Sequence, residues 1–308
     1  MNLFKNILYV NEPRVEQSIA LQRAVSLAEM NQARLTIMEV MPHIRGENPE
    51  NRRASQMERL DSLVAPYRQR LEIGIGVLEG KVFLEVIRAV LGNRHDLVIK
   101  PAENPDYLKQ VFGSEDMHLL RKCPCPLWLI KLPEKEKYDR VMAAVDFNPY
   151  KPDAEEKELN INILEMAASI AASDNAALHL VHAWEAYAET TMKVYGDAPD
   201  SQIATHVDKQ YRLHHKELFR LWETAKEGME SPAPSSPDFH LPRGPAKRTI
   251  ARFAEELQAD LIIMGTIGRT GISGLFIGNT AEAILNQVSC SVLAVKPSTF
   301  KTPVKLNS

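Results

Sequence analysis

Short apolar runs alternate with helical patterns along this chain. The run at residues 261–264 is apolar throughout, as expected for a strand buried on both faces. The clearest helical pattern lies at Ile250, Phe253, Ala254 and Leu257, which repeat at i, i+3, i+4 and i+7. Short strands that alternate with helices predict parallel sheets with helices on both faces, which is the doubly wound α/β class.

The pattern occurs twice. Residues 6–11 return as residues 141–146, and residues 125–131 return as residues 290–296. A repeat of this length indicates two copies of one domain plan. The offset between the copies grows from 135 residues at the first strand to 164 at the third, so the additional residues of the second copy fall in loops.

The repeat predicts two tandem domains of five strands each. We expect them at residues 1–136 and 137–298, with a charged linker at residues 132–139 and a tail at residues 299–308. The last strand of each half is an apolar edge, which would invite association with another strand. We therefore expect the two halves to pair within the chain, and a homodimer of the whole chain stays open.

Charge and composition narrow the classes of partner. The chain has 37 basic and 40 acidic residues, a formal net charge of -3 and no long basic block, which argues against nucleic-acid binding. No apolar run approaches the roughly 20 residues that span a bilayer. Residues 1–5 also lack the apolar core of a secretory signal. We expect a cytoplasmic protein that does not enter a membrane.

Cysteine and histidine give no metal or redox signal. Cys123, Cys125 and Cys290 lack the spacing of a metal or redox pair, and apolar neighbours favour buried thiols. The nine histidines are scattered without the spacing of a zinc site, so we expect no metal. His214 and His215, adjacent on a predicted helix, are expected on a solvated face.

Five of the 14 glycines fall within fourteen residues: Gly265, Gly268, Gly271, Gly274 and Gly278. They follow the apolar run at residues 261–264 and precede a helical pattern. A glycine loop between a strand and a helix lets backbone N–H groups converge on an anion, with the helix dipole adding favourable potential. Phosphate is the expected ligand.

The position of this loop agrees with the site expected for a doubly wound sheet. In such sheets the ligand lies beyond the carboxyl ends of the strands, where the strand order reverses. Asp146 ends the first strand of the second half and would face the same site. No Gly-Lys-Ser or Gly-Lys-Thr phosphate loop and no nucleophile elbow is present.

The loop resembles the nucleotide motif of ATP-binding universal stress proteins. Two residues separate Gly265 from Gly268, nine separate Gly268 from Gly278, and Asn279-Thr280 follows. Together with the repeat, the loop is most similar to tandem two-domain members of that family. The resemblance implies five-stranded parallel sheets in the order 3-2-1-4-5. It also implies that the second half binds ATP, or ADP or AMP, with Mg²⁺ as a possible companion.

The resemblance also implies roles for individual residues. Asp146 would contact ribose or base, the backbone near Ala183 would meet the adenine edge, and the glycines with Asn279 and Thr280 would hold phosphates, to which Arg269 could add charge. The candidate site comprises Asp146, Ala183, Met264, Gly265, Gly268, Arg269, Gly278, Asn279 and Thr280. An alternative is that Asn279 caps the following helix with Glu282 as its capping-box partner.

The first half departs from this motif. Pro101 replaces Gly265, Asn104 replaces Gly268, and Gly113 alone survives as the counterpart of Gly278. Proline removes a donor and fixes φ. Glu115 and Asp116 would place carboxylates at the helix start, where they satisfy the dipole internally. We predict that the first half, which also has Asn11 in place of Asp146, does not bind ATP in the family mode.

Lys100 closes an apolar strand at the corresponding position of the first half, aligned with Met264. It either binds another anionic ligand or pairs with Glu103.

Three functions stay open. The favoured one is a stress-response regulatory module that binds ATP in its second half, with no catalytic residue assigned. A slow nucleotide hydrolase is the alternative, with Asp146 as a candidate to orient water. The third is a carrier of a more apolar ligand in the first half, suggested by the divergent segment at residues 42–71.

Overall fold

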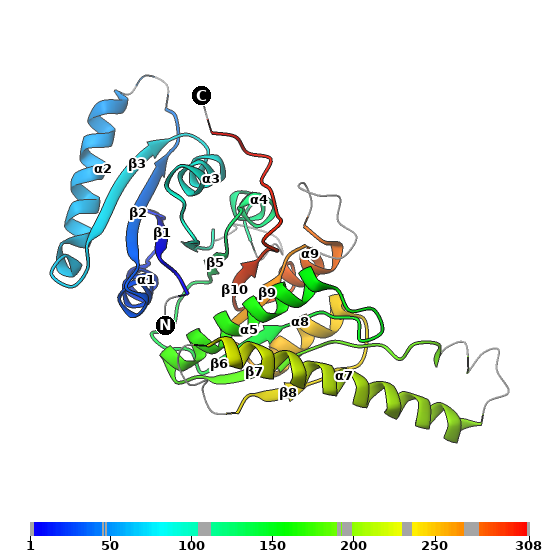
Figure 1. The fold of residues 1–308 in the computed structure, drawn as a ribbon. Helices are drawn as coiled ribbons and strands as arrows, with labels where there is room; N and C mark the ends of the chain where they lie inside the picture. Colours follow the sequence, from blue (N-terminus) through cyan, green and yellow to red (C-terminus); the bar gives the residue numbers. More distant parts are fainter. Residues whose placement is uncertain are drawn as a thin grey trace.

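The structure is a computed structural model that describes residues 3–44, 46, 48–103, 112–189, 192, 199–229, 236–267 and 277–306. Within these residues, ten strands form a single sheet with helices on both faces (Figure 1). None of the helices described is long and apolar enough to cross a membrane.

The first half contributes five strands to the sheet: β1 (Asn6–Asn11), β2 (Arg34–Met41), β3 (Ile73–Glu79), β4 (Leu97–Pro101) and β5 (Leu127–Ile130). They lie in the order β3-β2-β1-β4-β5 with parallel pairing throughout. The helices between them are α1 (Ser18–Asn31), α2 (Pro49–Val64), the 3-10 helix η1 (Ala65–Tyr67), α3 (Val82–Asn93) and α4 (Ser114–Lys122).

The second half repeats this plan with β6 (Arg140–Ala144), β7 (Ala177–Val181), β8 (Asp238–His240), β9 (Leu261–Gly265) and β10 (Ser291–Val295). Its order, β8-β7-β6-β9-β10, is again 3-2-1-4-5 and again parallel, which confirms the predicted fold of both halves. The helices are α5 (Ala154–Asp174), α7 (Asp200–Gly228), α8 (Ala246–Glu256) and α9 (Asn279–Leu285).

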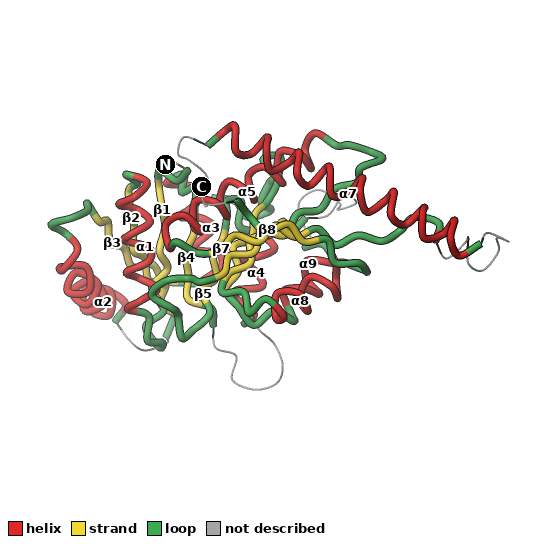
Figure 2. The backbone as a smooth tube through the Cα atoms, turned by 90° about the horizontal axis from the view of Figure 1, so that it is seen from below, coloured by secondary structure: helices red, strands yellow, loops and turns green. Residues whose placement is uncertain are grey.

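Each face of the sheet has its own hydrophobic core. Helices α1, α2, α5 and α7 cover one face, and α3, α4, α8 and α9 cover the other. In Figure 2, α5 and α7 lie on one side of the second-half strands and α8 and α9 on the opposite side. Each core runs through both halves, so the strands are buried on both faces as their apolar sequences predict.

The halves meet where β5 and β10 pair in antiparallel fashion, with Trp128 opposite Leu293. Buried Arg23 of α1 adds a second connection. Its guanidinium contacts Glu134 Oε1 through Nε and Asp174 Oδ2 through Nη1, both at 2.7 Å. A buried arginine is stable only when its donors are satisfied, and here the two carboxylates that satisfy it belong to the linker and to α5.

Candidate functional site

The carboxyl ends of β6 and β9 lie side by side in the second half, with Ala144 paired to Met264. Strand β7 flanks β6 on one side, and β10 flanks β9 on the other. The strand order therefore reverses between β6 and β9, which is where doubly wound sheets bind ligands. The segments that follow Ala144, Val181 and Gly265 all extend from this end of the sheet.

Asp146 lies two residues beyond β6 and is exposed. Buried Asn160 of α5 holds its backbone from both sides. The Asp146 N–H donates to Asn160 Oδ1 at 3.2 Å, and Asn160 Nδ2 donates to the Asp146 carbonyl at 2.7 Å. This clamp fixes the Asp146 backbone just beyond the end of β6. Sequence reasoning missed Asn160, whose signal is an amide at a core position of a helix.

Two buried histidines support the same segment. His182 Nδ1 lies 3.2 Å from the Val145 carbonyl, and its Nε2 lies 2.9 Å from His214 Nδ1. Since a carbonyl only accepts, Nδ1 of His182 donates to it and Nε2 accepts from His214. Phe147 stacks on His182 with ring centroids 3.8 Å apart. The expectation that His214 is solvated is therefore wrong, because it is 7% exposed, while His215 is exposed as predicted.

The base of the glycine loop is closed by backbone hydrogen bonds. Thr266 N donates to the Val295 carbonyl at 3.1 Å, and Gly278 N donates to the Thr266 carbonyl at 2.9 Å. Thr266 is fully buried, and its Oγ1 has no hydrogen-bond partner among the described residues. Gly268 and Arg269 lie outside the described residues, so their predicted roles stay predictions.

The remaining strand-end positions have packing roles. A Cβ at Gly265 would lie 3.1 Å from Leu159 Cδ2, so the absence of a side chain lets α5 approach the sheet. Met264 is buried in the core beneath α8 and α9. Ala183 is half-buried two residues beyond β7 and packs against the same core.

Helix α9 begins directly after the loop, with Gly278 as its N-cap in extended conformation. Asn279 and Thr280 are the first two helical residues, and both are exposed. The predicted capping box at Asn279 is wrong, because Asn279 lies inside the helix and the Glu282 side chain forms an ion pair with Arg121 of α4. A glycine N-cap supplies no side-chain acceptor to the first-turn N–H groups.

The corresponding position in the first half is filled by charged side chains. Lys100 Nζ donates to Asp116 Oδ1 at 2.9 Å and lies 3.4 Å from Glu12 Oε2, so the predicted pairing with Glu103 names the wrong partner. Lys100 and Asp116 are both fully buried. Burial alone would lower the pKa of Lys100, but the carboxylates of Asp116 and Glu12 raise it above its ordinary value.

Protein carboxylates occupy the start of α4, as predicted. Asp116 Oδ2 accepts from the Glu103 N–H at 2.6 Å, and Glu115 Oε2 accepts from the Phe83 N–H at 2.8 Å. Gly113 persists for a local reason, because a Cβ there would collide with the Glu103 side chain. Asn104 lies outside the described residues.

Asn11, the counterpart of Asp146, is buried. Its Nδ2 donates to Glu39 Oε2 at 2.7 Å, and the same oxygen accepts from Arg59 at 2.5 Å. Its side chain therefore serves an internal network instead of facing a ligand.

The three cysteines are buried free thiols, as predicted. Burial raises the pKa of Cys290 to about 12, so this thiol stays protonated and is a poor nucleophile.

The fold and the position of the loop define a tandem doubly wound α/β protein with a candidate ligand site in its second half. Residues 3–131 and 137–296 both match the universal stress protein family. The chain belongs to that family, with one family domain in each half.

Individual relatives agree with this assignment. Universal stress protein E of Escherichia coli (strain K12) is 29% identical over 327 residues, covering 100% of this chain and 98% of that protein. The Haemophilus influenzae homolog of universal stress protein E is 27% identical, covering 96% and 98%. A functionally unknown protein of Pseudomonas aeruginosa PAO1 has a TM-score of 0.73 at 25% identity, covering 96% of this chain and 93% of that one. The predicted likeness to tandem members of the family is confirmed.

Proposed function

We propose that the second half binds ATP, or ADP or AMP, and that the chain is a cytoplasmic stress-response regulator that responds to this nucleotide. Mg²⁺ would accompany the phosphates. The two halves would act as one unit through the β5–β10 pairing, and association of whole chains into a homodimer remains compatible with this proposal.

The observation that carries the proposal is the loop between Thr266 and Gly278. Its glycine spacing resembles the family's ATP motif, its two ends are joined by one backbone hydrogen bond, and it leads into a helix with a glycine N-cap. Backbone N–H groups at such a helix start favour an anion. The exposed carboxylate of Asp146 lies at the neighbouring strand end, where a ribose hydroxyl would donate to it.

Calorimetric titration of ATP into the full chain tests the proposal with matched variants. Asn279→Ala in the second half should weaken ATP binding about tenfold, the loss expected for one hydrogen bond to a charged group. Ser114→Ala at the equivalent exposed position of the first half should leave it unchanged. No ATP binding by the wild-type chain, or equal losses in both variants, would refute the proposed site.

Hydrolysis is the alternative within the same site. Repeated turnover that Asp146→Ala abolishes while ATP still binds would assign the chain to the enzymes. Retained nucleotide without turnover supports the regulatory role.

A cavity favours a second candidate function, carriage of a more apolar ligand by the first half. Its volume is about 390 Å³, within the range of small-molecule sites. Its lining includes four apolar and two polar side chains: Leu8, Met38, Ile75, Leu78, Arg88 and His95.

His95 is one of the polar residues that line this cavity. Its Nδ1 lies 3.1 Å from Asn6 Oδ1, which accepts, so Nδ1 carries the proton. Its Nε2 is buried without a partner among the described residues, and burial lowers the pKa of the ring. The cavity wall is mainly apolar, which suits a ligand with an apolar body.

Native mass spectrometry of the purified chain tests this second function. A Cβ at Gly76 would meet nothing within 4 Å, so Gly76→Leu should fill the cavity and Gly76→Ala should not. We expect a co-purified small molecule to be lost from Gly76→Leu alone, with ATP binding intact. Unchanged small-molecule content in Gly76→Leu would remove the cavity as a ligand site.

A further inference from the structure

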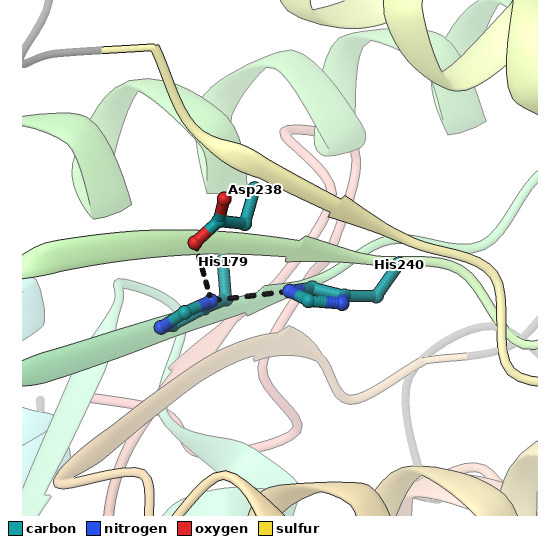
Figure 3. A group of neighbouring side chains, drawn as sticks. All are labelled: His179, Asp238 and His240. Atoms are coloured by element: carbon teal, nitrogen blue, oxygen red, sulfur yellow. Dashed lines mark hydrogen bonds and ion pairs between the residues drawn. The ribbon is translucent and has the colours of Figure 1, made fainter.

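Two histidines and an aspartate meet at the β8 edge of the sheet (Figure 3). His179 Nδ1 lies 3.1 Å from His240 Nε2 and 3.4 Å from Asp238 Oδ2. The three ligand atoms all lie within 4.8 Å of one another. His179 comes from β7, and the other two residues come from β8.

The strand register explains why residues about 60 positions apart converge. His179 is directly paired with Asp238 in the parallel β7–β8 ladder, and Val181 is paired with His240. Alternate residues of a strand point to the same face, so His179, Asp238 and His240 share one face. The side chains on β8 are separated by a single residue, Phe239, which points to the opposite face and contacts α7.

We propose that His179, Asp238 and His240 bind a divalent metal ion of the Zn²⁺ class. Zinc holds imidazole nitrogen at 2.0–2.1 Å and carboxylate oxygen at about 2.0–2.2 Å, so two ligand atoms of a tetrahedral site are about 3.3 Å apart. The observed separations of 3.1 and 3.4 Å lie on either side of that value. Two imidazoles with one carboxylate are also a donor set that zinc uses in proteins.

Zinc binds the unprotonated nitrogen of an imidazole. His179 Nδ1 and His240 Nε2 are the two ring nitrogens that face each other. Phe253 of α8 packs 4.9 Å from the His240 ring and helps to fix its orientation.

Exposure differs among the three ligands in a way that suits an exchangeable ion. The His179 side chain is 9% exposed and that of Asp238 is 67% exposed. The buried imidazole anchors the ion, and the exposed carboxylate offers a path for its entry. The described residues supply three ligands, which leaves a fourth tetrahedral position for water or another donor.

Zinc titration of the full chain, after dialysis against a chelator, tests the site by competition with a chromophoric zinc indicator. The wild-type chain should bind one equivalent that His240→Ala and Asp238→Asn each weaken by roughly tenfold or more. His215→Ala, an exposed histidine on α7, is the matched control and should bind as wild type does. Unchanged zinc affinity in both site variants would overturn the proposal.

Cobalt substitution gives a readout that a folding defect cannot imitate. The wild-type chain loaded with Co²⁺ should show the intense visible bands of tetrahedral coordination without a thiolate charge-transfer band. A thiolate band would place the ion at cysteine instead, and the weak bands of six-coordinate cobalt would also contradict the site. Zinc should raise the thermal midpoint of wild type and not of His240→Ala, since a ligand that binds only the folded chain stabilises it.

Discussion

The two halves share one strand order and differ in the chemistry at the point where that order reverses. In the first half, β4 carries Lys100 and the first turn of α4 carries Asp116, and the two form a fully buried ion pair. The equivalent residues in the second half are Met264 and Ala281, both buried and apolar. The same scaffold therefore accepts either an internal charge pair or two apolar side chains at this point.

The residues at the carboxyl ends of β1 and β6 also differ between the halves in burial and in partners. Asn11 is buried against Glu39, whereas Asp146 is exposed while Asn160 fixes its backbone. His182 occupies the position equivalent to Glu39, and its ring donates to the Val145 carbonyl, next to Asp146. The first half uses its polar groups internally, and the second half uses them to hold one carboxylate toward solvent.

The largest expected effect comes from breaking the ion pair of the first half. Lys100→Met would leave Asp116 buried without its cation, which should lower the free energy of unfolding by about 3–5 kcal/mol. Asp116→Ala should cost less, because Glu12 still faces Lys100. The double variant Lys100→Met and Asp116→Ala copies the second half and should recover most of the loss. Urea unfolding of all three variants measures the coupling energy between the two side chains. If the loss of unfolding free energy in the double variant equals the sum of the two single losses, the residues do not act as a pair.

The reverse transfer, a carboxylate in the first turn of α9, should weaken nucleotide binding in the second half. Ala281→Asp places a carboxylate in the first turn of α9. Repulsion between a carboxylate and a phosphate at 4 Å amounts to about 1 kcal/mol in water and about 4 kcal/mol near a protein surface. ATP affinity should therefore fall by between about fivefold and about a thousandfold in calorimetry. Ala281→Asn is the neutral control, and a similar loss there would assign the effect to packing.

Acid should lower the stability of the second half by protonating buried His214. Burial lowers the pKa of His214 below its ordinary value of 6.5. The unfolded chain then binds this proton more readily than the folded chain, so stability falls as pH drops below about 6.5 and is intact above it. Unfolding measured between pH 7.5 and 5.5 should show a smaller loss in His214→Gln than in wild type. Equal losses would show that other groups carry the acid dependence.

Sequence patterns predicted the fold because the strands and helices of one half repeat at matching positions in the other half. They also predicted that Asp146 follows a strand beside the one that leads into the glycine loop, and the pairing of β6 with β9 agrees with this, since parallel strands bring their carboxyl ends together. They did not predict the role of Asn160 or the contact between His182 and His214. The residues in each contact lie on separate elements and meet only when α5 and α7 pack against the sheet. The same limit explains Lys100: Glu103 is nearer along the chain, but the first turn of α4 brings Asp116 to the amine.

The smallest expected effect concerns Gly265, whose counterpart in the first half is Pro101. Gly265→Ala would place a Cβ 3.1 Å from Leu159 Cδ2, and overpacking of this kind costs about 1–3 kcal/mol of stability. Leu159→Val should relieve the contact and restore stability in the double variant. Because the added Cβ points toward α5, we expect ATP affinity to recover with it, to within about threefold, or about 0.7 kcal/mol. A loss of affinity that persists in the stable double variant would show instead that the nucleotide itself requires glycine at this strand end.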